Sequence, residues 1–365
     1  MPAVTGFGVF SADGSPPRVG WCDGGEAVDL TALGDVFAQH SLNELLALGR
    51  GGWADALAAA RAHDGPRVPL AEAALHLPFD VADYVDFYSS LEHATNMGRL
   101  FRPDAEPLPP SWRFMPVGYH GRAGTVVVTG TDVVRPRGQL VPPGSEAPVF
   151  APSRRLDLEL ELGFVVGVPS DGGSVPPDRF ADHVFGVVLV NDWSARDIQA
   201  WEYVPLGPFL GKSFQTSISA WVTPLALLEE SRVEAPAQEP PVLPHLSDGR
   251  DWALDLELEI ELNGDVVSRG NARRLYWTMP QQLAHVTSNG ASLRTGDLLA
   301  SGTISGAAPG SEGSLIELTR NGERPLRLPD GSVRRFLEDG DEVVLRGRGG
   351  DVRLGEVRGR VLPAA

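Results

Sequence analysis

Glycine and proline recur at short, irregular intervals along this chain, and they limit the length of any helix or strand. The 365 residues include 42 glycines and 31 prolines with no periodic spacing. Glycine tolerates left-handed backbone and proline fixes φ and lacks an N–H, so both mark turns. Many turns between short apolar segments are typical of β-rich proteins. We therefore predict a mainly β fold of the α+β class, with mostly antiparallel strands and few helices.

The spacing of apolar residues predicts where the individual elements lie. Helices are expected at residues 36–48 and 53–62, where apolar residues recur every three or four positions. Asn263-Gly264 predicts a tight hairpin turn. Strand patterns dominate the rest of the chain and cover residues 125–128, 156–166, 184–190, 254–262, 298–301, 314–318 and 342–345.

The length of the chain predicts more than one structural unit. A chain of 365 residues exceeds the usual size of a single domain, and 42% hydrophobic residues suffice for a large core. Short strands and both predicted helices fall within residues 1–80, before a proline-bearing segment. We predict a small N-terminal domain at 1–80 and a large β-rich domain at 81–365.

Charge and cysteine content exclude several classes of protein. A net charge of −17 disfavours a nucleic-acid-binding surface, which needs clustered cations to neutralise phosphates. Cys22 is the only cysteine, so neither a disulfide framework nor a cysteine-based zinc site is expected. The N-terminus lacks a signal-peptide pattern, and no apolar run is long enough to span a bilayer. We predict a cytoplasmic protein with no nucleic-acid or membrane partner.

Lys212 is the only lysine among 31 cationic residues, which makes all the others arginine. It lies in a glycine- and proline-rich stretch, residues 207–214. A lysine ammonium is compact and can approach a single oxygen, whereas a guanidinium is a broad plane. A site that requires the smaller cation would explain its retention, and composition alone leaves chance survival open.

Two strand patterns carry alternating acids. In the stretch 156–162, alternation places Asp157, Glu159 and Glu161 on one face and leucines on the other. Such carboxylates repel one another and need either water or a cation. The stretch 254–262 shows the same alternation. The pattern therefore does not decide which strand, if either, holds a metal ion.

Two further clusters are candidates for chemistry. If residues 191–199 are helical, Asp192, Arg196 and Gln199 share one face, directly after an apolar strand. The alternative is an exposed Asp–Arg pair of little energetic weight. His93 has the polar neighbours Asp86 and Tyr88, although a lone histidine is more often structural or exposed than catalytic.

Long sequence runs resemble those of the fumarylacetoacetase (fumarylacetoacetate hydrolase) family. They follow the family's order from about residue 83 to the C-terminus, so the resemblance covers most of the chain. The first 80 residues match less sharply. The runs are DFYSS, HATN, MPVGYHGRAG, NDWSARDIQ, WEYVPLGPFLGKSF, YWTM, QQL, GDLLASGTISG and FLEDGDEV.

The resemblance implies a fold and an activity. It implies an SH3-like domain at 1–80, a mixed β-sandwich or roll catalytic domain at 81–365, and a homodimer. The implied reaction is metal-dependent hydrolysis of the carbon–carbon bond of 4-fumarylacetoacetate to fumarate and acetoacetate, the last step of tyrosine and phenylalanine catabolism. A histidine-activated water attacks a calcium-polarised carbonyl in the implied mechanism.

The resemblance also assigns roles to individual residues. Catalytic roles fall to the general base His93, its partner Glu317, and the oxyanion and carbanion stabilisers Arg196, Gln199 and Lys212. Implied contacts to the diketo acid substrate are Tyr88, Arg102, Tyr119, Arg196, Gln199, Tyr203 and Thr303. The implied metal-site residues are Asp86, Glu159, Glu161 and Asp192 as Ca²⁺ ligands, with Lys212 and Thr216 beside them. Four carboxylates suit Ca²⁺ or Mg²⁺ better than zinc.

One departure from the family pattern concerns a second, structural Mg²⁺ or Na⁺ site. The family places glycine before a threonine there, whereas Gln215 precedes Thr216 in this chain. Two other functions remain open on the residues. A lyase acting on a related oxo-acid would share the acidic metal site, and a non-catalytic calcium-binding protein would keep the metal without the chemistry.

Overall fold

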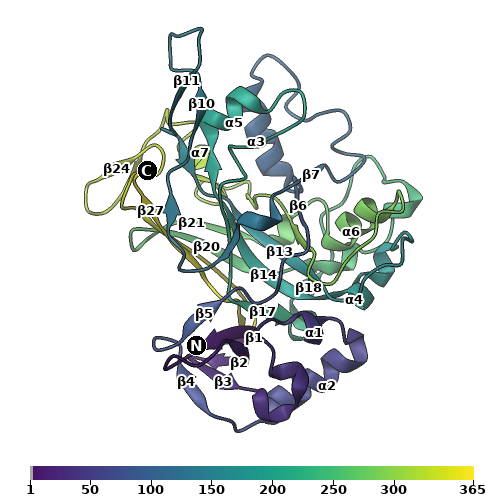
Figure 1. The fold of residues 1–365 in the computed structure, drawn as a ribbon. Helices are drawn as coiled ribbons and strands as arrows, with labels where there is room; N and C mark the ends of the chain where they lie inside the picture. Colours follow the sequence, from purple (N-terminus) through teal and green to yellow (C-terminus); the bar gives the residue numbers. More distant parts are fainter. Residues whose placement is uncertain (1–2) are drawn as a thin grey trace.

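The structure, a computed structural model, describes residues 3–365 as a mainly β protein with short helices. Figure 1 shows the N-terminal strands, α1 and α2 in a small lobe, below a larger body that holds most of the other elements. One mixed sheet runs through both parts, and most of its strand pairs are antiparallel. The predicted fold class is confirmed at this level. The helices are α1 (Asn43–Leu46), α2 (Gly49–Ala62), α3 (Leu91–Phe101), α4 (Phe180–His183), α5 (Arg196–Glu202), α6 (Met279–Thr287) and α7 (Leu315–Leu318).

The N-terminal lobe is joined to the body through both the sheet and the core. β1 pairs with β17 in the body, with Phe7 opposite Val222. Phe7 is also buried in one hydrophobic cluster with Val188 and Leu298 of the body. The two parts therefore share apolar contacts. The lobe strands are β1 (Ala3–Ser11), β2 (Arg18–Gly24), β3 (Glu26–Asp29), β4 (Arg67–Pro69) and β5 (Ala74–His76).

The central strands of the body are covered on both faces. Every residue of β14 is buried, which explains its nearly continuous apolar sequence. β13 is buried just as completely and lies between β14 and β22. The central strands are β6 (Tyr84–Phe87), β7 (Gly118–His120), β8 (Val126–Val128), β13 (Leu160–Val166), β14 (Val184–Asp192), β16 (Thr216–Ile218), β17 (Trp221–Pro224) and β22 (Leu298–Ala300).

The outer strands expose one face to solvent. In β20, Leu258 and Ile260 are buried, whereas Glu257 pairs with Arg348 at the surface. The predicted hairpin is confirmed, because Asn263 and Gly264 both adopt positive φ and join β20 to β21. The outer strands are β9 (Val133–Val134), β20 (Glu257–Leu262), β21 (Asp265–Asn271), β25 (Glu342–Gly349), β26 (Val352–Arg353) and β27 (Val357–Leu362).

Four two-stranded ribbons complete the fold. The ribbon of β10 (Arg137–Leu140) and β11 (Val149–Pro152) projects from the body at the end opposite the N-terminal lobe (Figure 1). The helices α3, α5 and α7 lie toward this same end (Figure 1). The other ribbons pair β12 (Leu156–Asp157) with β15 (Ser194–Ala195), β18 (Arg232–Val233) with β19 (Ala253–Leu254), and β23 (Leu326–Arg327) with β24 (Val333–Arg334).

One predicted element is wrong in type, and another is much shorter than predicted. The stretch 314–318 is not a strand: its residues Leu315–Leu318 form the helical turn α7. The backbone N–H groups of Leu315 and Ile316 donate to the carboxylate of Asp157 from a distant strand, which favours the turn. The helix predicted at 36–48 is reduced to the 3₁₀ turn Asp35–Phe37 and the four residues of α1.

Two further predictions need smaller corrections. The strand predicted at 156–166 is interrupted between β12 and β13, so Asp157 and Glu161 belong to different strands. Asp192 ends β14 and is not helical; of the three residues predicted on one helix face, only Arg196 and Gln199 lie in α5. Within residues 3–365, no helix has the length and apolar character needed to cross a membrane.

Candidate active site and metal centre

Four buried carboxylates converge where the central strands end. They come from β6, from the isolated β-bridge residue directly before β13, from β13 itself and from the last residue of β14, and one ligand oxygen of each lies within 4.8 Å of the others. Strand pairing fixes this arrangement: Asp86 lies opposite Ala300 on β22, and Glu161 opposite Val190 on β14. The group consists of Asp86, Glu159, Glu161 and Asp192.

Protein cations balance only part of this charge. Lys212 Nζ donates to Glu159 and, over 2.7 Å, to Asp192 Oδ2. Arg196 donates to Glu159 Oε1 over 2.7 Å. Burial alone would raise the pKa of Glu159, but Arg196 and Lys212 outweigh it and hold that pKa below its ordinary range. The only lysine of the chain therefore lies in this site.

Glu161 and Asp86 show that the group suits a hard cation. Neither carboxylate oxygen of Glu161, nor Oδ1 of Asp86, has a hydrogen-bond partner within residues 3–365. Burial, followed by the nearby Asp192 or Asp86 carboxylates, raises the pKa of both acids well above the ordinary range. Buried oxygens without donors are costly unless a cation takes the donors' place. Asp86 and Glu161 form no ion pair with a lysine or arginine among the described residues, so their two charges match that of a divalent ion. Ligands that are all carboxylates fit Ca²⁺ or Mg²⁺.

His93 lies between this acidic group and a second carboxylate. Its Nδ1 is 2.6 Å from Glu317 Oε2, and its Nε2 is 3.9 Å from Glu159 Oε1. A carboxylate can only accept, so Nδ1 carries the proton and Nε2 is left to accept one. Ser90 caps α3, and its hydroxyl accepts from the backbone N–H of His93 over 3.3 Å, which fixes the histidine in the first turn.

Glu317 is held by several donors besides His93. Ser305 and Ser314 donate to Oε2 over 2.9 and 2.6 Å, and Asn96 donates to Oε1 over 2.9 Å. Burial raises the pKa of Glu317, but His93 and these hydrogen bonds outweigh it and lower that pKa below its ordinary value. Glu317 therefore stays ionised and fixes the tautomer of His93.

A cavity of about 350 Å³ opens over these groups. Its wall combines the acidic site with aromatic and cationic side chains, which suits an anionic organic ligand. The buried hydroxyl of Thr303 has no hydrogen-bond partner among the described residues and lines the cavity. Of the residues singled out from the sequence, the cavity wall includes Asp86, Tyr88, His93, Arg102, Tyr119, Glu159, Arg196, Gln199, Tyr203, Lys212 and Thr303.

The remaining sequence candidates lie around this wall. Glu161, Asp192 and Glu317 lie behind it within the hydrogen-bonded and acidic groups already described. Thr216 donates from Oγ1 to Asp192 Oδ1 over 3.1 Å. Tyr119 donates to the other oxygen of Asp192, also over 3.1 Å, so its hydroxyl is bound to the acidic group.

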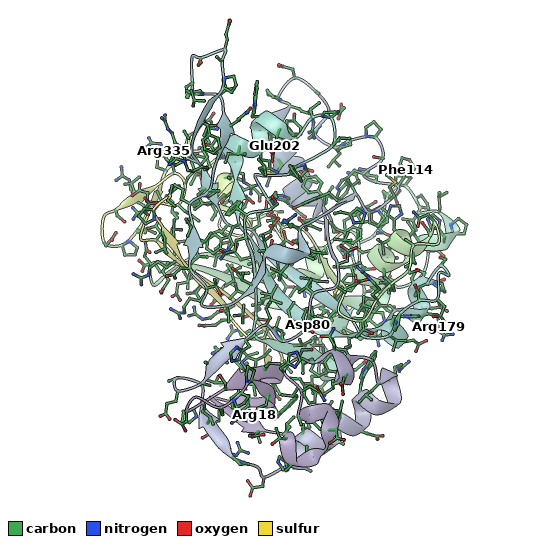
Figure 2. The ribbon with its side chains drawn as sticks, viewed as in Figure 1. Arg18, Asp80, Phe114, Arg179, Glu202 and Arg335 are labelled. Atoms are coloured by element: carbon green, nitrogen blue, oxygen red, sulfur yellow. The ribbon has the colours of Figure 1, made fainter. Side chains whose placement is uncertain are left out.

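The loop that carries Lys212 is fixed at its base by Glu202. Glu202 Oε1 accepts from the backbone N–H groups of Phe209 and Gly211 over 2.9 and 2.7 Å. Glu202 ends α5, at the opposite end of the molecule from Arg18 of the N-terminal lobe (Figure 2). These two hydrogen bonds span the turn that leads into Lys212, so they hold this loop against α5.

Sequence reasoning missed part of the hydrogen-bond network. Ser305, Ser314 and Asn96 were not identified as partners of Glu317, because residues far apart in sequence meet only in the folded chain. Ser90 is a preferred N-cap residue directly before the first residue of α3, and this signal could have marked the start of the helix. Asp157 was placed with the other acids of its strand, but it lies outside the acidic group.

Comparisons with known proteins identify the family to which this chain is similar. Residues 83–362 match the family model described as fumarylacetoacetate (FAA) hydrolase, C-terminal. The chain is 44% identical to the fumarylacetoacetase of Homo sapiens, with 98% of this chain and 95% of that protein covered. It is 42% identical to the fumarylacetoacetase of Arabidopsis thaliana, with 98% and 94% covered.

Solved structures share the fold at low sequence identity. A fumarylacetoacetate hydrolase from Exiguobacterium antarcticum matches with a TM-score of 0.61 and 18% identity, over 98% of this chain and 99% of that one. A maleylpyruvate hydrolase from Sphingobium, solved with manganese(II) and pyruvate, matches with a TM-score of 0.58 and 20% identity, over 99% and 100%. These two likenesses bear on the fold alone. The family match and the near full-length relatives together establish that this chain belongs to the fumarylacetoacetase family.

Proposed function

We propose that this chain hydrolyses 4-fumarylacetoacetate to fumarate and acetoacetate, the final step of tyrosine and phenylalanine breakdown. The observation that carries the proposal is the 2.6 Å contact between His93 and Glu317 beside four buried carboxylates, in a cavity lined by cations. Hydrolysis of a carbon–carbon bond needs an activated water, stabilisation of a tetrahedral alkoxide and stabilisation of a carbanion leaving group. Separate residues of the site suit each need.

The acidic group is proposed as the Ca²⁺ site, with Asp86, Glu159, Glu161 and Asp192 as ligands. Their partnerless oxygens and uncompensated charge support this assignment. When bound, such an ion acts as a Lewis acid on a carbonyl oxygen of the substrate. Mg²⁺ is the alternative among hard cations.

His93 is proposed as the general base that takes a proton from water through Nε2. Histidine can accept a proton at neutral pH, and the Glu317 carboxylate at Nδ1 stabilises the resulting imidazolium. Water then attacks the carbonyl carbon, and the electron pair of the broken carbon–carbon bond passes to the acetoacetate fragment as its enolate. The proton held by His93, or one from Lys212, completes this fragment.

Lys212, Arg196 and Gln199 are proposed to stabilise the developing negative charges. Lys212 is buried yet lines the cavity, and Gln199 accepts from Arg196 Nη1 over 3.1 Å. Donors fixed in this way are worth about 3–4 kcal/mol each, or roughly 10²–10³ in rate, because they need no reorganisation during the reaction.

The remaining wall residues are proposed to bind the two carboxylates and the carbonyls of the substrate. All of them line the cavity and carry a hydroxyl or guanidinium group: Tyr88, Arg102, Tyr119, Tyr203 and Thr303. The partnerless hydroxyl of Thr303 supports a direct contact with the ligand. Arg102 donates to the backbone carbonyl of Pro107 over 2.8 Å, which orients its guanidinium.

We further propose that a Mg²⁺ or Na⁺ ion binds near Thr216, since backbone oxygens can ligate an ion despite Gln215. The division into an SH3-like domain at 1–80 and a β-sandwich or roll domain at 81–365 is proposed as well. The start of the family match at residue 83 supports that boundary. A cytoplasmic location remains a prediction from the sequence.

A homodimer is proposed with residues 201–210 in the interface. This segment exposes several large apolar side chains, including Val204, Leu206 at 95% exposure and Phe209. Contiguous exposed apolar surface usually marks an interaction site. Leu206→Ser with Phe209→Ser should shift the mass measured by light scattering from dimer to monomer, and a wild-type monomer at micromolar concentration would contradict the proposal.

The proposed reaction is tested by following fumarylacetoacetate by absorbance in calcium and in chelator, with products identified by mass. Fumarate and acetoacetate formed only with metal support the hydrolase. Carbon dioxide, or a cleavage product formed without addition of water, would assign the chain to the lyases. Calcium binding without turnover would favour the non-catalytic alternative.

A further inference from the structure

Asp157 is a fully buried carboxylate for which the proposed chemistry has no role. It is not part of the acidic group, although its strand pattern predicts the same face as Glu159 and Glu161. The interruption between β12 and β13 separates it from those two residues. Its oxygens instead contact two elements that carry proposed catalytic residues, α5 and α7.

One carboxylate oxygen of Asp157 accepts hydrogen bonds from both α5 and α7. Oδ2 accepts from Arg196 Nε over 2.8 Å and from the backbone N–H of Ile316 over 3.2 Å. Oδ1 accepts from the backbone N–H groups of Leu315 and Leu158, each over 2.8 Å. The carboxylate therefore connects the side chain of Arg196 to the first two residues of α7.

α7 is the four-residue turn that carries Glu317. So short a helix gains little from its own backbone bonds, because most of its N–H groups lack partners within it. The carboxylate of Asp157 satisfies two of these N–H groups and also compensates the guanidinium of Arg196. The position of Glu317, and through it that of His93, depends on the same atoms that orient Arg196.

We propose that Asp157 is a positioning residue that sets the distance between the water-activating pair, His93 and Glu317, and the charge-stabilising Arg196. This inference rests on the proposed function for its kinetic consequences. It does not require Asp157 to touch the substrate, since Asp157 is absent from the cavity wall. Misplacing reacting groups by about 1 Å can cost roughly 10²-fold in rate, so a shared support matters to both halves of the site.

Asp157→Asn is the most specific substitution for this test, because it conserves the shape of the side chain and removes two of the four hydrogen bonds that the carboxylate accepts. If the amide oxygen takes the Oδ1 position, it keeps the bonds from Leu315 and Leu158. The amide nitrogen then faces two donors, Arg196 Nε and the N–H of Ile316. Asp255 is the matched control, because it holds the equivalent position in the second acidic pattern. Within residues 3–365 its carboxylate accepts from Asn271 at the end of β21 and from Arg273 in the turn that follows, far from the catalytic groups in sequence.

The expected result for Asp157→Asn is a fall in kcat of about 10–100-fold, by loss of alignment. KM and the calcium-induced thermal shift should change much less than kcat, because the substitution removes no side chain from the cavity wall or the acidic group. Asp255→Asn should leave all three unchanged. In a double-mutant cycle with Arg196→Lys, the two kcat effects should be strongly non-additive, because both substitutions break the same hydrogen bond between Arg196 Nε and Asp157 Oδ2. Additive effects, or a wild-type kcat in Asp157→Asn, would overturn the proposal.

Hydrogen exchange tests the same proposal without using turnover. In Asp157→Asn, faster exchange should be confined to peptides that cover α7 and residues 194–202. Exchange that is unchanged there, or faster throughout the chain, would refute a positioning role. If Asp157→Asn does not fold, Asp157→Glu keeps the charge but displaces it; a folded Asp157→Glu with wild-type kcat and exchange would also refute it. Failure of the wild type to hydrolyse fumarylacetoacetate would count against the proposed function, and the exchange result would still decide the role of Asp157.

Discussion

Replacing Glu161 by glutamine tests the proposed metal site at the ligand whose two oxygens both lack hydrogen-bond donors. Glu161 is completely buried, and within residues 3–365 neither of its oxygens accepts a hydrogen bond. Two unit charges 4.8 Å apart, the span of the ligand oxygens, repel by about 3.5 kcal/mol at an effective dielectric constant of about 20. This repulsion and burial raise the pKa of Glu161 and disfavour its charge in the metal-free protein, so a neutral glutamine costs little there, whereas calcium binding needs the charged carboxylate. Glu161→Gln should therefore weaken calcium binding without lowering the stability of the metal-free protein.

The thermal shift follows from the size of the chain. At about 2.1 cal/mol/K per residue, 365 residues have an unfolding entropy of about 0.8 kcal/mol/K. Calcium at 100 times its Kd stabilises the wild type by about 2.7 kcal/mol, and hence by about 3–4 °C. If the lost carboxylate raises Kd by about 100-fold, the same calcium stabilises the variant by only about 0.4 kcal/mol, or about 0.5 °C.

The assay is differential scanning fluorimetry in chelator and in calcium, with isothermal titration to measure Kd. Glu259→Gln is the control, because Glu259 holds the equivalent position in the second acidic pattern and pairs with Arg269 at the surface. It should keep the full wild-type shift. A wild-type calcium shift in Glu161→Gln would show that the acidic group is not the ion site. A metal-free variant that melts well below the metal-free wild type would show that the charge of Glu161 stabilises the fold.

The remaining predictions concern chemistry and packing. His93→Ala should lose hydrolysis and keep the calcium shift; appreciable turnover in a rate assay would mean that another group activates water. Lys212→Arg should lower kcat by about 10²-fold or more, since a planar guanidinium does not reproduce the ammonium position, and an unchanged kcat would remove the geometric argument for lysine. Gly302→Ala should lower the melting temperature and kcat, because a Cβ would lie 2.0 Å from the carbonyl oxygen of Phe87 at a φ of +75°. Gly173→Ala, where a Cβ meets open space, is its control, and equal melting temperatures for the two variants would contradict the steric reasoning.

Local patterns predicted the elements whose environment is simple. The hairpin at Asn263-Gly264 depends on its own two residues, and the buried strand β14 is marked by a continuous apolar run. Residues 314–318 show the opposite case. Their apolar pattern suits a strand, but a carboxylate from Asp157 satisfies the first N–H groups of a helical turn instead. A prediction from local sequence cannot include Asp157, which is more than 150 residues away along the chain.

The two acidic patterns show why alternation of acidic and apolar residues was not enough to predict the metal site. Glu159 and Glu257 occupy equivalent positions in similar sequences, yet Glu159 is buried and bonded to Lys212, whereas Glu257 is 61% exposed and paired with Arg348. The difference lies in burial, because both faces of β13 are buried whereas only one face of β20 is. The family resemblance supplied this missing information, and it also pointed to Glu317, for which no local signal exists.

The shared sheet between the N-terminal lobe and the body has a consequence for biosynthesis. β1 leaves the ribosome before its partner β17, which follows roughly 200 residues later, a delay of about 10–40 s at about 5–20 residues per second. During that interval Phe7 and Val9 lack the body strands that later cover them. We expect the nascent chain to depend on chaperones that bind apolar segments, and a ribosome-bound fragment ending before β17 to be far more sensitive to protease than the finished protein.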